Sequence, residues 1–371
     1  MSRNIPALDG FRAISICLVI AGHIFDANFA GKAYTEKTYT QAILGNGSLG
    51  VTIFFVISGY LITTLLLREF DRLGNISLRH FYIRRAFRIL PPYYVYLLVV
   101  CAVAMLGYLP ITRLQAGSAF LFLWDYLPQV KTWSLEHLWS LSVEEQFYVL
   151  WPLSLLLCLR KSRRAARRLA LICIVLAPIG RVGTYFTHSY YSSQLYFMLH
   201  TRIDSLMFGC LAALAEGHPS FESIYRRMAR YRYLMIVFIF GLSPVLGHRF
   251  GARYVYVLGY SLEGLFIAAS MLWLIRNPDT LFGRLLNQSS VKQIGVMSYS
   301  LYIWQTIFLH SENHSVLGHF PINVVSVFVC AALSYRCVEL PSLALRERLF
   351  SLRKVSMPPQ MAAVSADCAS L

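Results

Sequence analysis

Apolar runs long enough to cross a lipid bilayer recur along the whole chain, each followed by a short polar segment. A membrane-spanning helix needs about 17–25 mostly apolar residues, and about ten such runs can be placed. The pattern therefore predicts an all-α, polytopic membrane protein, a bundle of about ten transmembrane helices. A further apolar stretch at 116–126 is typical of a re-entrant or interfacial piece. The predicted spans are 11–29, 49–67, 91–109, 143–159, 169–186, 203–215, 233–247, 255–275, 294–309 and 322–335.

Composition agrees with a membrane protein. Hydrophobic residues make up 57% of the chain, charged residues only 14%, and the mean hydropathy is +0.53, which excludes an ordinary soluble globule. The net charge of +16 does not predict a nucleic-acid partner, because the basic residues fall in short clusters between apolar runs. The eight cysteines show no paired spacing and mostly lie in apolar runs, so neither disulfides nor a metal site is predicted.

The distribution of lysine and arginine predicts how the chain is oriented. With ten spans, 26 of the 34 basic residues fall on one side and six on the other. Basic loops stay in the cytoplasm, so both termini are predicted to be cytoplasmic, and an odd number of spans would destroy the asymmetry. Residues 1–345 then form one transmembrane domain. Residues 346–371 form a cytoplasmic tail, predicted to be largely disordered because its end is rich in Pro, Ala and Ser.

Two polar residues interrupt the first span. Arg12 and His23 are eleven residues apart, so on a helix they share one face and lie roughly 16 Å apart along the axis. Arg12 alone is most simply an anchor at the lipid headgroups. His23 has a structural alternative as well, a hydrogen bond to a neighbouring carbonyl. Function is favoured for His23, because ionisable side chains inside spans are costly and usually mark a site.

The second span carries small residues at Gly50 and Gly59, which predict close packing against another helix and no chemistry. Ser58 and Tyr60 are polar residues in the same span that would suit the wall of a cavity. No role is assigned to either from the sequence.

A basic segment leads into the third span on the predicted cytoplasmic side. Arg84 and Arg88 are four residues apart and face the same way on a helix, with Arg85 beside them. Clustered guanidinium groups suit phosphate oxygens, such as those of coenzyme A. The alternative is a positive cluster that contacts anionic lipid heads and binds no ligand.

Carboxylates gather at the predicted outer end of the fourth span. Glu144 and Glu145 also suit the positive end of a helix dipole, so structure alone explains one of them. By helical periodicity Glu144 and Tyr148 share a face, while Glu145 points elsewhere.

Other polar residues lie in the later spans. Arg202 and Asp204 open the sixth span at the same predicted outer level as Glu144. Arg181, in the fifth span, is a candidate for a structural ion pair with Asp204. Glu263, near the centre of the eighth span, has no assignable partner.

These residues together resemble the acyltransferase-3 family of integral membrane O-acyltransferases. The blocks that carry the resemblance follow one another in the expected order over about residues 5–345, and six ordered blocks are far more specific than one. They are residues 8–12 with His23, 54–60, Arg84-Arg85-x-x-Arg88, 139–148, 202–204 and 298–302.

The resemblance implies a ten-helix bundle in the cell inner membrane. It would transfer an acyl group, usually acetyl, from cytoplasmic acyl-CoA to a hydroxyl of a glycan, a lipid-linked sugar or a secondary metabolite. It implies that activity depends on Arg12 and His23 and that Arg84, Arg85 and Arg88 serve acyl-CoA. The chain resembles the stand-alone form of the family, which has no fused periplasmic domain, and no metal is implied.

The resulting hypothesis places the donor phosphates at Arg12 and at Arg84 to Arg88 and the thioester near His23. His23 is then either the general base or the nucleophile that carries the acyl group. Glu144 or Asp204 would orient the imidazole or hold the acceptor. The predicted catalytic residues are His23, Arg12 and Glu144, and the predicted substrate-binding residues are Glu145, Tyr148, Arg202 and Asp204.

A proton-coupled secondary transporter is the alternative function, because buried His, Arg and Glu side chains also form proton relays. The two halves of the chain show no repeat, which argues against it. The acceptor, the acyl chain length and the oligomeric state are not readable from the sequence.

Overall fold

The computed structural model describes residues 6–28, 38–127, 132–187 and 194–355, and every regular element in these ranges is a helix. Seven helical stretches in them are long and apolar enough to cross a membrane. The all-α prediction is thus confirmed for the described residues. The seven stretches are Ala7–Ala27, Tyr39–Leu73, Leu78–Met105, Arg163–Thr187, Arg232–Phe250, Ala252–Arg276 and Ile322–Phe350.

Three of the ten predicted spans are absent from these seven. They correspond to α6 (Leu138–Lys161), α8 (Leu199–Ala215) and α16 (Ser298–Leu309). Helix α16 has 12 residues, fewer than a complete crossing needs, and α8 has 17, at the lower end of the usual range. Helix α6 has 24 residues, but Glu144, Glu145 and Gln146 lower its hydropathy. The number ten therefore stays a prediction.

The remaining helices connect or extend these spans. The π-helical turns η6 (Phe238–Leu242), η7 (Val255–Gly259) and η9 (Tyr335–Glu339) continue neighbouring α-helices. The other bounds are α1 (Pro6–Asn28), α2 (Tyr39–Leu44), α3 (Gly47–Leu73), α4 (Leu78–Met105), α5 (Arg113–Phe120), η2 (Trp124–Tyr126), η3 (Trp133–Leu135), α7 (Arg163–Thr187), η5 (Gln194–Tyr196), α9 (Pro219–Arg230), α10 (Arg232–Val237), α11 (Ser243–Phe250), α12 (Ala252–Tyr254), α13 (Tyr260–Arg276), α14 (Leu281–Leu286), α15 (Ser289–Val296), η8 (Val316–Gly318), α17 (Ile322–Ser334) and α18 (Leu340–Val355).

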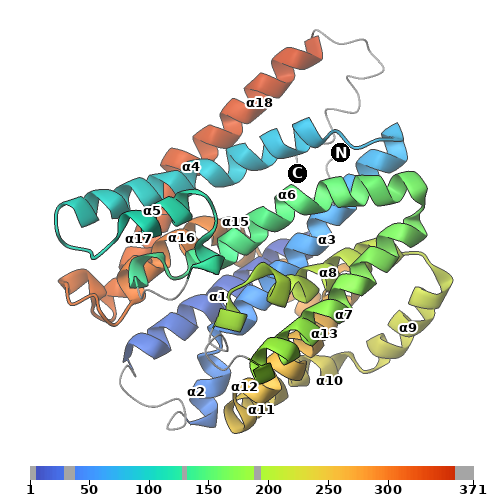
Figure 1. Cartoon of the computed structure of the whole chain (residues 1–371), viewed down its shortest axis with the longest axis horizontal. Coiled ribbons are helices and arrows are strands. Elements are labelled where there is room, and N and C mark those ends of the chain that lie inside the picture. The colour runs from blue at the N-terminus through green and yellow to red at the C-terminus, as the bar shows by residue number, and fades with distance from the viewer. Residues whose placement is uncertain (1–5, 29–37, 128–131, 188–193, 356–371) are drawn as a thin grey trace.

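Helix α3 lies at the centre of the bundle, packed against α1 on one side and α8 on the other (Figure 1). The crossing of α3 and α8 is close because glycines face each other's backbones. A Cβ atom on Gly59 would lie 1.9 Å from the carbonyl oxygen of Leu206, and one on Gly209 would lie 2.1 Å from that of Val56. Close packing at Gly59 was predicted and is confirmed.

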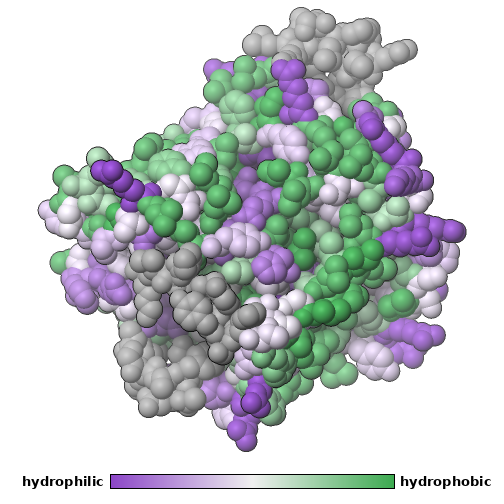
Figure 2. Space-filling model, viewed as in Figure 1, coloured by the Kyte–Doolittle hydropathy of each residue, from purple (hydrophilic) through white to green (hydrophobic). Residues whose placement is uncertain are grey.

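The helices on the outside of the bundle expose apolar side chains. Leu150 on α6, Ile179 on α7 and Val325 on α17 are 57%, 59% and 60% exposed. Figure 2 shows mostly hydrophobic residues on the right half of one face, polar residues near its centre, and strongly hydrophilic residues along its right edge, where Figure 1 places α9 and the turn between α6 and α7. An apolar belt with a charged rim is what a bilayer requires of a protein that spans it.

Helix α4 differs from the prediction at its start. The basic segment was predicted to lie in a loop before a span at 91–109, whereas α4 continues through Pro91 and Pro92. Pro91 has no N–H and leaves the carbonyl of Phe87 without its helical donor. The hydroxyl of Ser342 on α18 donates to that carbonyl at 2.6 Å, which explains why the helix continues.

The domain boundary predicted at residue 345 falls within α18, which is helical from Leu340 to Val355. The helical part of the chain therefore reaches beyond that boundary. The rest of the tail, residues 356–371, lies outside the described residues.

Candidate active site

One cavity inside the bundle, here called the arginine cavity, has a volume of about 90 Å³. Helices α1, α3, α4, α6 and α16 each contribute to its wall. It brings together residues from five of the six sequence blocks that carry the family resemblance, all except the block at 202–204. Its polar lining consists of Arg12, Ser58, Arg85, Arg88, Ser140, Glu144, Glu145, Tyr148, Ser298, Tyr299 and Tyr302.

The carboxylate side of this cavity is held by hydrogen bonds. The hydroxyl of Ser58 donates to Oε1 of Glu144 at 2.7 Å and lies 3.0 Å from the hydroxyl of Tyr148. Tyr148 in turn donates to Oε2 of Glu144 at 3.3 Å, which agrees with the prediction that these two residues share a face. Glu145 was predicted to point elsewhere but lines the same cavity.

The basic side of the cavity keeps most of its donors free. Arg12 donates to Oδ1 of Asp9 at 2.9 Å, one helical turn earlier. The guanidinium of Arg85 lies 5.1 Å from the centre of the Tyr148 ring, a cation–π contact. Among the described residues, neither Arg85 nor Arg88 makes a hydrogen bond or an ion pair. Two guanidiniums with unused donors therefore face the cavity.

Arg84 does not join them. It was predicted to face the same way as Arg88, but Nη2 of Arg84 lies 3.4 Å from Oε2 of Glu69 on α3, and Arg84 is absent from the cavity wall. On a helix both the i, i+3 and the i, i+4 neighbour are close to one face, so the sequence spacing does not choose between them. The position of Glu69 fixes the choice in favour of Arg85.

The level of Glu144 also needs correction. The sequence placed the carboxylates at the outer mouth and the arginines at the cytoplasmic mouth. In the structure Glu144 lies six residues inside α6, Arg85 lies seven residues inside α4, and Ser58 is near the middle of α3. The two groups therefore meet inside the bundle, because α4 and α6 begin earlier than the predicted spans.

A second, larger cavity of about 500 Å³ contains His23 and is here called the histidine cavity. His23 and Asp26, three residues apart on α1, both line it. Aromatic rings and further carboxylates complete the wall. The ionisable and aromatic lining residues are His23, Asp26, Glu136, His137, Trp139, Tyr196, Phe197, Tyr254, Tyr256, Tyr260, Glu263 and Tyr302.

Glu263, which had no partner in the sequence analysis, has one here. The hydroxyl of Ser243 donates to Oε1 of Glu263 at 2.6 Å, and Tyr254 donates to Ser243 at 2.9 Å. All three residues line the histidine cavity. These hydrogen bonds link α12, α11 and α13 at the wall of the cavity.

The hypothesis that Glu144 or Asp204 orients His23 requires correction. Glu144 lies in the wall of the arginine cavity, and Asp204 lines neither cavity. The carboxylate that accompanies His23 is Asp26 on its own helix. A sequence places residues by depth along a span, but it does not reveal which helices are neighbours.

The two cavities share part of their walls. Val51 and Tyr302 line both, so only these side chains and their neighbours separate them. The Tyr302 hydroxyl lies 2.5 Å from the hydroxyl of Ser140 and donates to the carbonyl of His137 at 3.1 Å. Val51 and Tyr302 thus lie between the two cavities, and Tyr302 is hydrogen-bonded to the start of α6.

His137 is a site residue that the sequence analysis did not single out. It lies in the histidine cavity beside that tyrosine, and only 3% of its surface is exposed. Burial lowers the pKa of its imidazole to about 3, and the neighbouring His23 adds to the shift. A single histidine just before a span shows no periodic pattern, so only the packing of η3 against α16 reveals its place.

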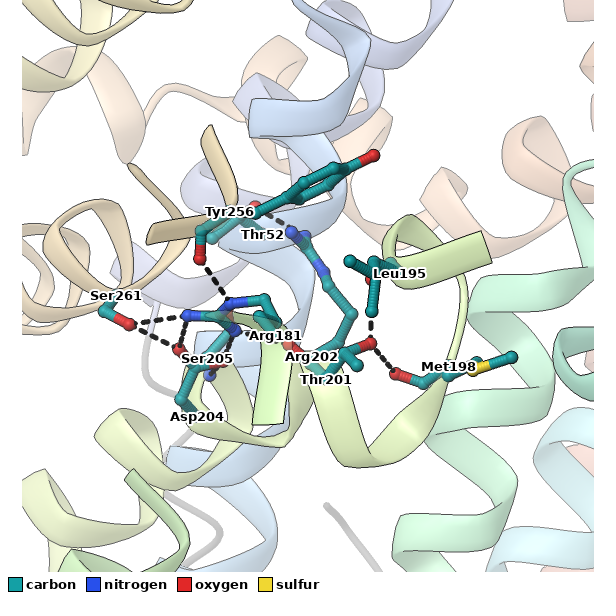
Figure 3. A network of polar contacts seen from close by, with 10 residues as sticks. All are labelled: Thr52, Arg181, Leu195, Met198, Thr201, Arg202, Asp204, Ser205, Tyr256 and Ser261. Carbon is teal, nitrogen blue, oxygen red and sulfur yellow. Dashed lines mark hydrogen bonds and ion pairs between the residues drawn. The ribbon is translucent and has the colours of Figure 1, made fainter. Parts of the chain in front are cut away.

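Asp204 forms an ion pair with Arg181 deep in the protein (Figure 3). Arg181 donates to both carboxylate oxygens, at 3.0 and 2.7 Å, and the hydroxyl of Ser261 donates to Oδ2 at 2.7 Å. Both side chains of the pair are 0% exposed. The predicted structural ion pair is confirmed, and neither residue lines the arginine cavity or the histidine cavity.

Arg202 is also fully buried outside both cavities. Its guanidinium lies 3.6 Å from the centre of the Tyr260 ring and donates to the hydroxyl of Thr52 at 2.9 Å. These contacts are structural, and the predicted role of Arg202 and Asp204 in binding substrate stays a prediction. Among the described residues, no three His, Cys, Asp or Glu side chains gather as metal ligands would.

Comparison with known families agrees with this architecture. The family model described as an acyltransferase domain, acyltransferase-3, matches residues 5–335. The match includes the helices that carry both cavities. The chain is a multi-pass membrane protein with buried polar cavities, and it belongs to the acyltransferase-3 family.

Individual proteins similar to this chain are named O-acetyltransferases. O-acetyltransferase OatA from Staphylococcus aureus strain NCTC 8325 is 30% identical over 372 residues, which cover 91% of this chain and 57% of that protein. OatA from S. aureus strain COL has the same identity and coverage. The chain thus spans a little over half the length of these relatives. No solved structure shows a significant match to the chain.

Proposed function

We propose that this protein is an integral membrane O-acyltransferase, which moves an acetyl group from acyl-CoA to a hydroxyl of a cell-envelope or exported glycan or glycolipid. The observation that carries the proposal is the adjacency of the two cavities within a chain of the acyltransferase-3 family. Arg85 and Arg88, unpaired among the described residues, face one cavity, His23 lines the other, and Tyr302 lines both.

The arginine cavity is the proposed donor side. Phosphate oxygens bind guanidinium groups well, and the donors of Arg85 and Arg88 are unused within the described protein. A volume of about 90 Å³ is far too small for a nucleotide, so only a phosphate or the thioester arm of acyl-CoA enters it. Glu144 and Glu145 line the same cavity and would repel phosphates that moved past the arginines.

The proposed topology has ten spans in the inner membrane of the cell. Both termini lie in the cytoplasm. The excess of basic residues on one side supports it. In that orientation the turn between α3 and α4 faces the cytoplasm, where acyl-CoA is available. The histidine cavity then lies toward the opposite side, near the turn between α2 and α3.

The histidine cavity is the proposed acceptor side. Its volume of about 500 Å³ and its mixture of aromatic rings with carboxylates suit a sugar, whose apolar faces stack on rings while its hydroxyls donate to acids. His23 would take the proton of the acceptor hydroxyl as general base, or take the acyl group as nucleophile. The relatives are named O-acetyltransferases, which favours acetyl as the acyl group.

Transport of protons with a solute, the alternative function, has no support in the comparisons, since the matching family model describes an acyltransferase. A polar residue within a span fits both functions. The separation of basic and histidine residues into two adjacent cavities favours group transfer.

The test uses purified protein in lipid nanodiscs, acetyl-CoA, and a panel of methyl glycosides and extracted glycolipids as acceptors. We expect CoA release that depends on an acceptor. We expect His23→Ala to lower the rate by about 10²–10⁴-fold, as loss of a general base does. An undiminished rate in His23→Ala would remove His23 from the chemistry. Absence of any CoA release with every acceptor would contradict the acyltransferase assignment.

A further inference from the structure

His137 is an imidazole placed where the two cavities meet. Its backbone carbonyl accepts the hydroxyl of Tyr302 at 3.1 Å and that of Ser140 at 3.2 Å. The residue lines the histidine cavity together with His23, whose charge is close enough to affect its pKa. His137 therefore lines the histidine cavity directly beside Tyr302, which lines both cavities.

The ring of His137 makes no hydrogen bond that the described residues provide. Neither Nδ1 nor Nε2 has a partner, although the residue is 97% buried. The backbone of Ile303 is near enough to influence the ring but lacks hydrogen-bond geometry. A buried polar group without a partner costs about 1–3 kcal/mol, so its retention calls for an explanation.

Packing does not supply that explanation. The imidazole ring contacts Tyr96 and Tyr302 edge to face, at centroid distances of 5.3 and 5.7 Å. A phenyl ring makes such contacts at least as well and has no polar atoms to bury. The nitrogen atoms are therefore what distinguishes histidine at this position, and a bound ligand is the partner that would use them.

We propose that His137 is a catalytic residue, which donates a ring N–H to the carbonyl oxygen of the acyl group as that group is transferred. The inference rests on the proposed O-acyltransferase function and adds a second imidazole with a separate role. The ligand is a thioester carbonyl, which becomes an oxyanion in the transition state.

With these two histidines, every proton and electron pair in the transfer is accounted for. The acceptor oxygen forms a bond to the thioester carbonyl carbon while His23 takes the hydroxyl proton, and the C=O electron pair moves onto the oxygen. The N–H of His137 stabilises that oxygen. The carbonyl then re-forms, the C–S bond breaks, and the CoA sulfur leaves and receives the proton from His23. If His23 first carries the acyl group, the same oxygen becomes negative in each half of the reaction.

The state of the ring suits a donor that keeps its proton. Burial and the neighbouring His23 lower the pKa of His137, so the imidazole is neutral at physiological pH and carries one N–H. A neutral donor stabilises a developing oxyanion without itself giving up a proton. His23 is left as the group that exchanges protons.

The test compares His137→Phe, which keeps the ring packing without N–H, with His137→Gln, which restores an amide N–H. Acetyl-CoA is the donor, the panel of methyl glycosides supplies the acceptors, and the proteins are purified in nanodiscs. We expect His137→Phe to lower kcat about 10²–10³-fold, the usual loss of an oxyanion donor, with the KM for acetyl-CoA within about 3-fold of wild type. We expect His137→Gln to recover at least about 10-fold of the lost kcat.

Thermal unfolding separates this role from a structural one. Removing an unpartnered polar group should leave the Tm of His137→Phe unchanged or higher, whereas a structural histidine would lower it. A kcat for His137→Phe above about one third of wild type, or no recovery in His137→Gln, would overturn the inference and leave the proposed function intact. No turnover by wild-type protein with any acceptor would overturn both.

Discussion

Two groups of arginines and carboxylates lie inside this bundle, and they differ in how their hydrogen-bonding capacity is used. Arg181 donates to Asp204, Ser261 and the carbonyls of Thr201 and Tyr256, so its five N–H groups all have acceptors within the protein. Arg85, at the arginine cavity, has a ring contact but no hydrogen bond among the described residues.

The difference separates a structural network from a candidate site. Charged residues inside spans usually mark function. In the sequence, Arg181 with Asp204 was nevertheless a candidate structural ion pair, and Arg85 belonged to the basic segment before the third span. A guanidinium whose donors all end on the protein has nothing left for a ligand. A guanidinium that faces a cavity with free donors still has its binding capacity. A further ion pair, Glu222 with Arg276, lies at the surface and is less buried than the pair of Arg181 with Asp204.

The largest effect is expected for the buried pair. Arg181→Met leaves the Asp204 carboxylate buried without its partner, which typically costs about 3–5 kcal/mol. We expect a large loss of folded protein on size-exclusion chromatography and a lower Tm in nanodiscs. The double variant Arg181→Met with Asp204→Leu should regain most of the stability. A stable and fully active single variant would contradict the structural role of this pair.

An intermediate effect is expected at the arginine cavity. There a substitution should change the affinity for acetyl-CoA and leave the stability of the protein nearly unchanged. Arg85→Met should weaken acetyl-CoA binding about 10–100-fold, the loss of a hydrogen bond to a charged group being about 1.5–3 kcal/mol. The Tm should change little, because Arg85 has no ion pair with any residue that the structure describes.

Arg84→Met is the matched control for Arg85→Met. Arg84 is adjacent in sequence and equal in charge, but it faces Glu69 at 3.4 Å. Isothermal titration with acetyl-CoA should show less than about a 3-fold change for this variant. Equal losses in both variants would mean that general positive charge, and not the cavity, attracts the donor.

The smallest effect is expected at the surface pair. Arg276 donates to both carboxylate oxygens of Glu222, at 2.8 and 2.9 Å, and these hydrogen bonds lower the pKa of Glu222 below its ordinary 4.5. A lowered pKa in the folded state means that the stabilisation is present above pH 4.5 and is lost as the pH falls through the lowered value.

Glu222→Gln should therefore lower the Tm slightly at pH 7, since exposed pairs contribute about 1 kcal/mol or less. The difference from wild type should shrink as the pH falls below 4.5. Melting curves at several pH values measure this. A difference that grows toward acidic pH would show that the sign of the pKa shift is wrong.

Two local predictions from the sequence are confirmed. The shared face of Glu144 and Tyr148 follows from the geometry of a single helix, and the close packing at Gly59 follows from the small size of glycine. The family resemblance added the order of the blocks, and the family match over residues 5–335 confirms the family.

Contacts between helices that are distant in the chain could not be predicted from the sequence. The hydroxyl of Ser342 that lets α4 continue through Pro91 comes from more than 250 residues away, so the start of that span was misplaced. The same holds for Tyr302, which reaches the start of α6, and for Glu69, which removes Arg84 from the cavity. These contacts depend on which helices are neighbours, and periodicity carries no information on that point.

The central claim is that one cavity receives the donor and the adjacent cavity receives the acceptor, on opposite sides of Tyr302. Proteoliposomes with the protein in one orientation test it directly, with acetyl-CoA sealed on the side of the turn between α3 and α4 and a glycan acceptor on the other side. Mass spectrometry of the acceptor should show the added mass of one acetyl group, and only when donor and acceptor are in opposite compartments. Acetylation only when both are in the same compartment would contradict the claim.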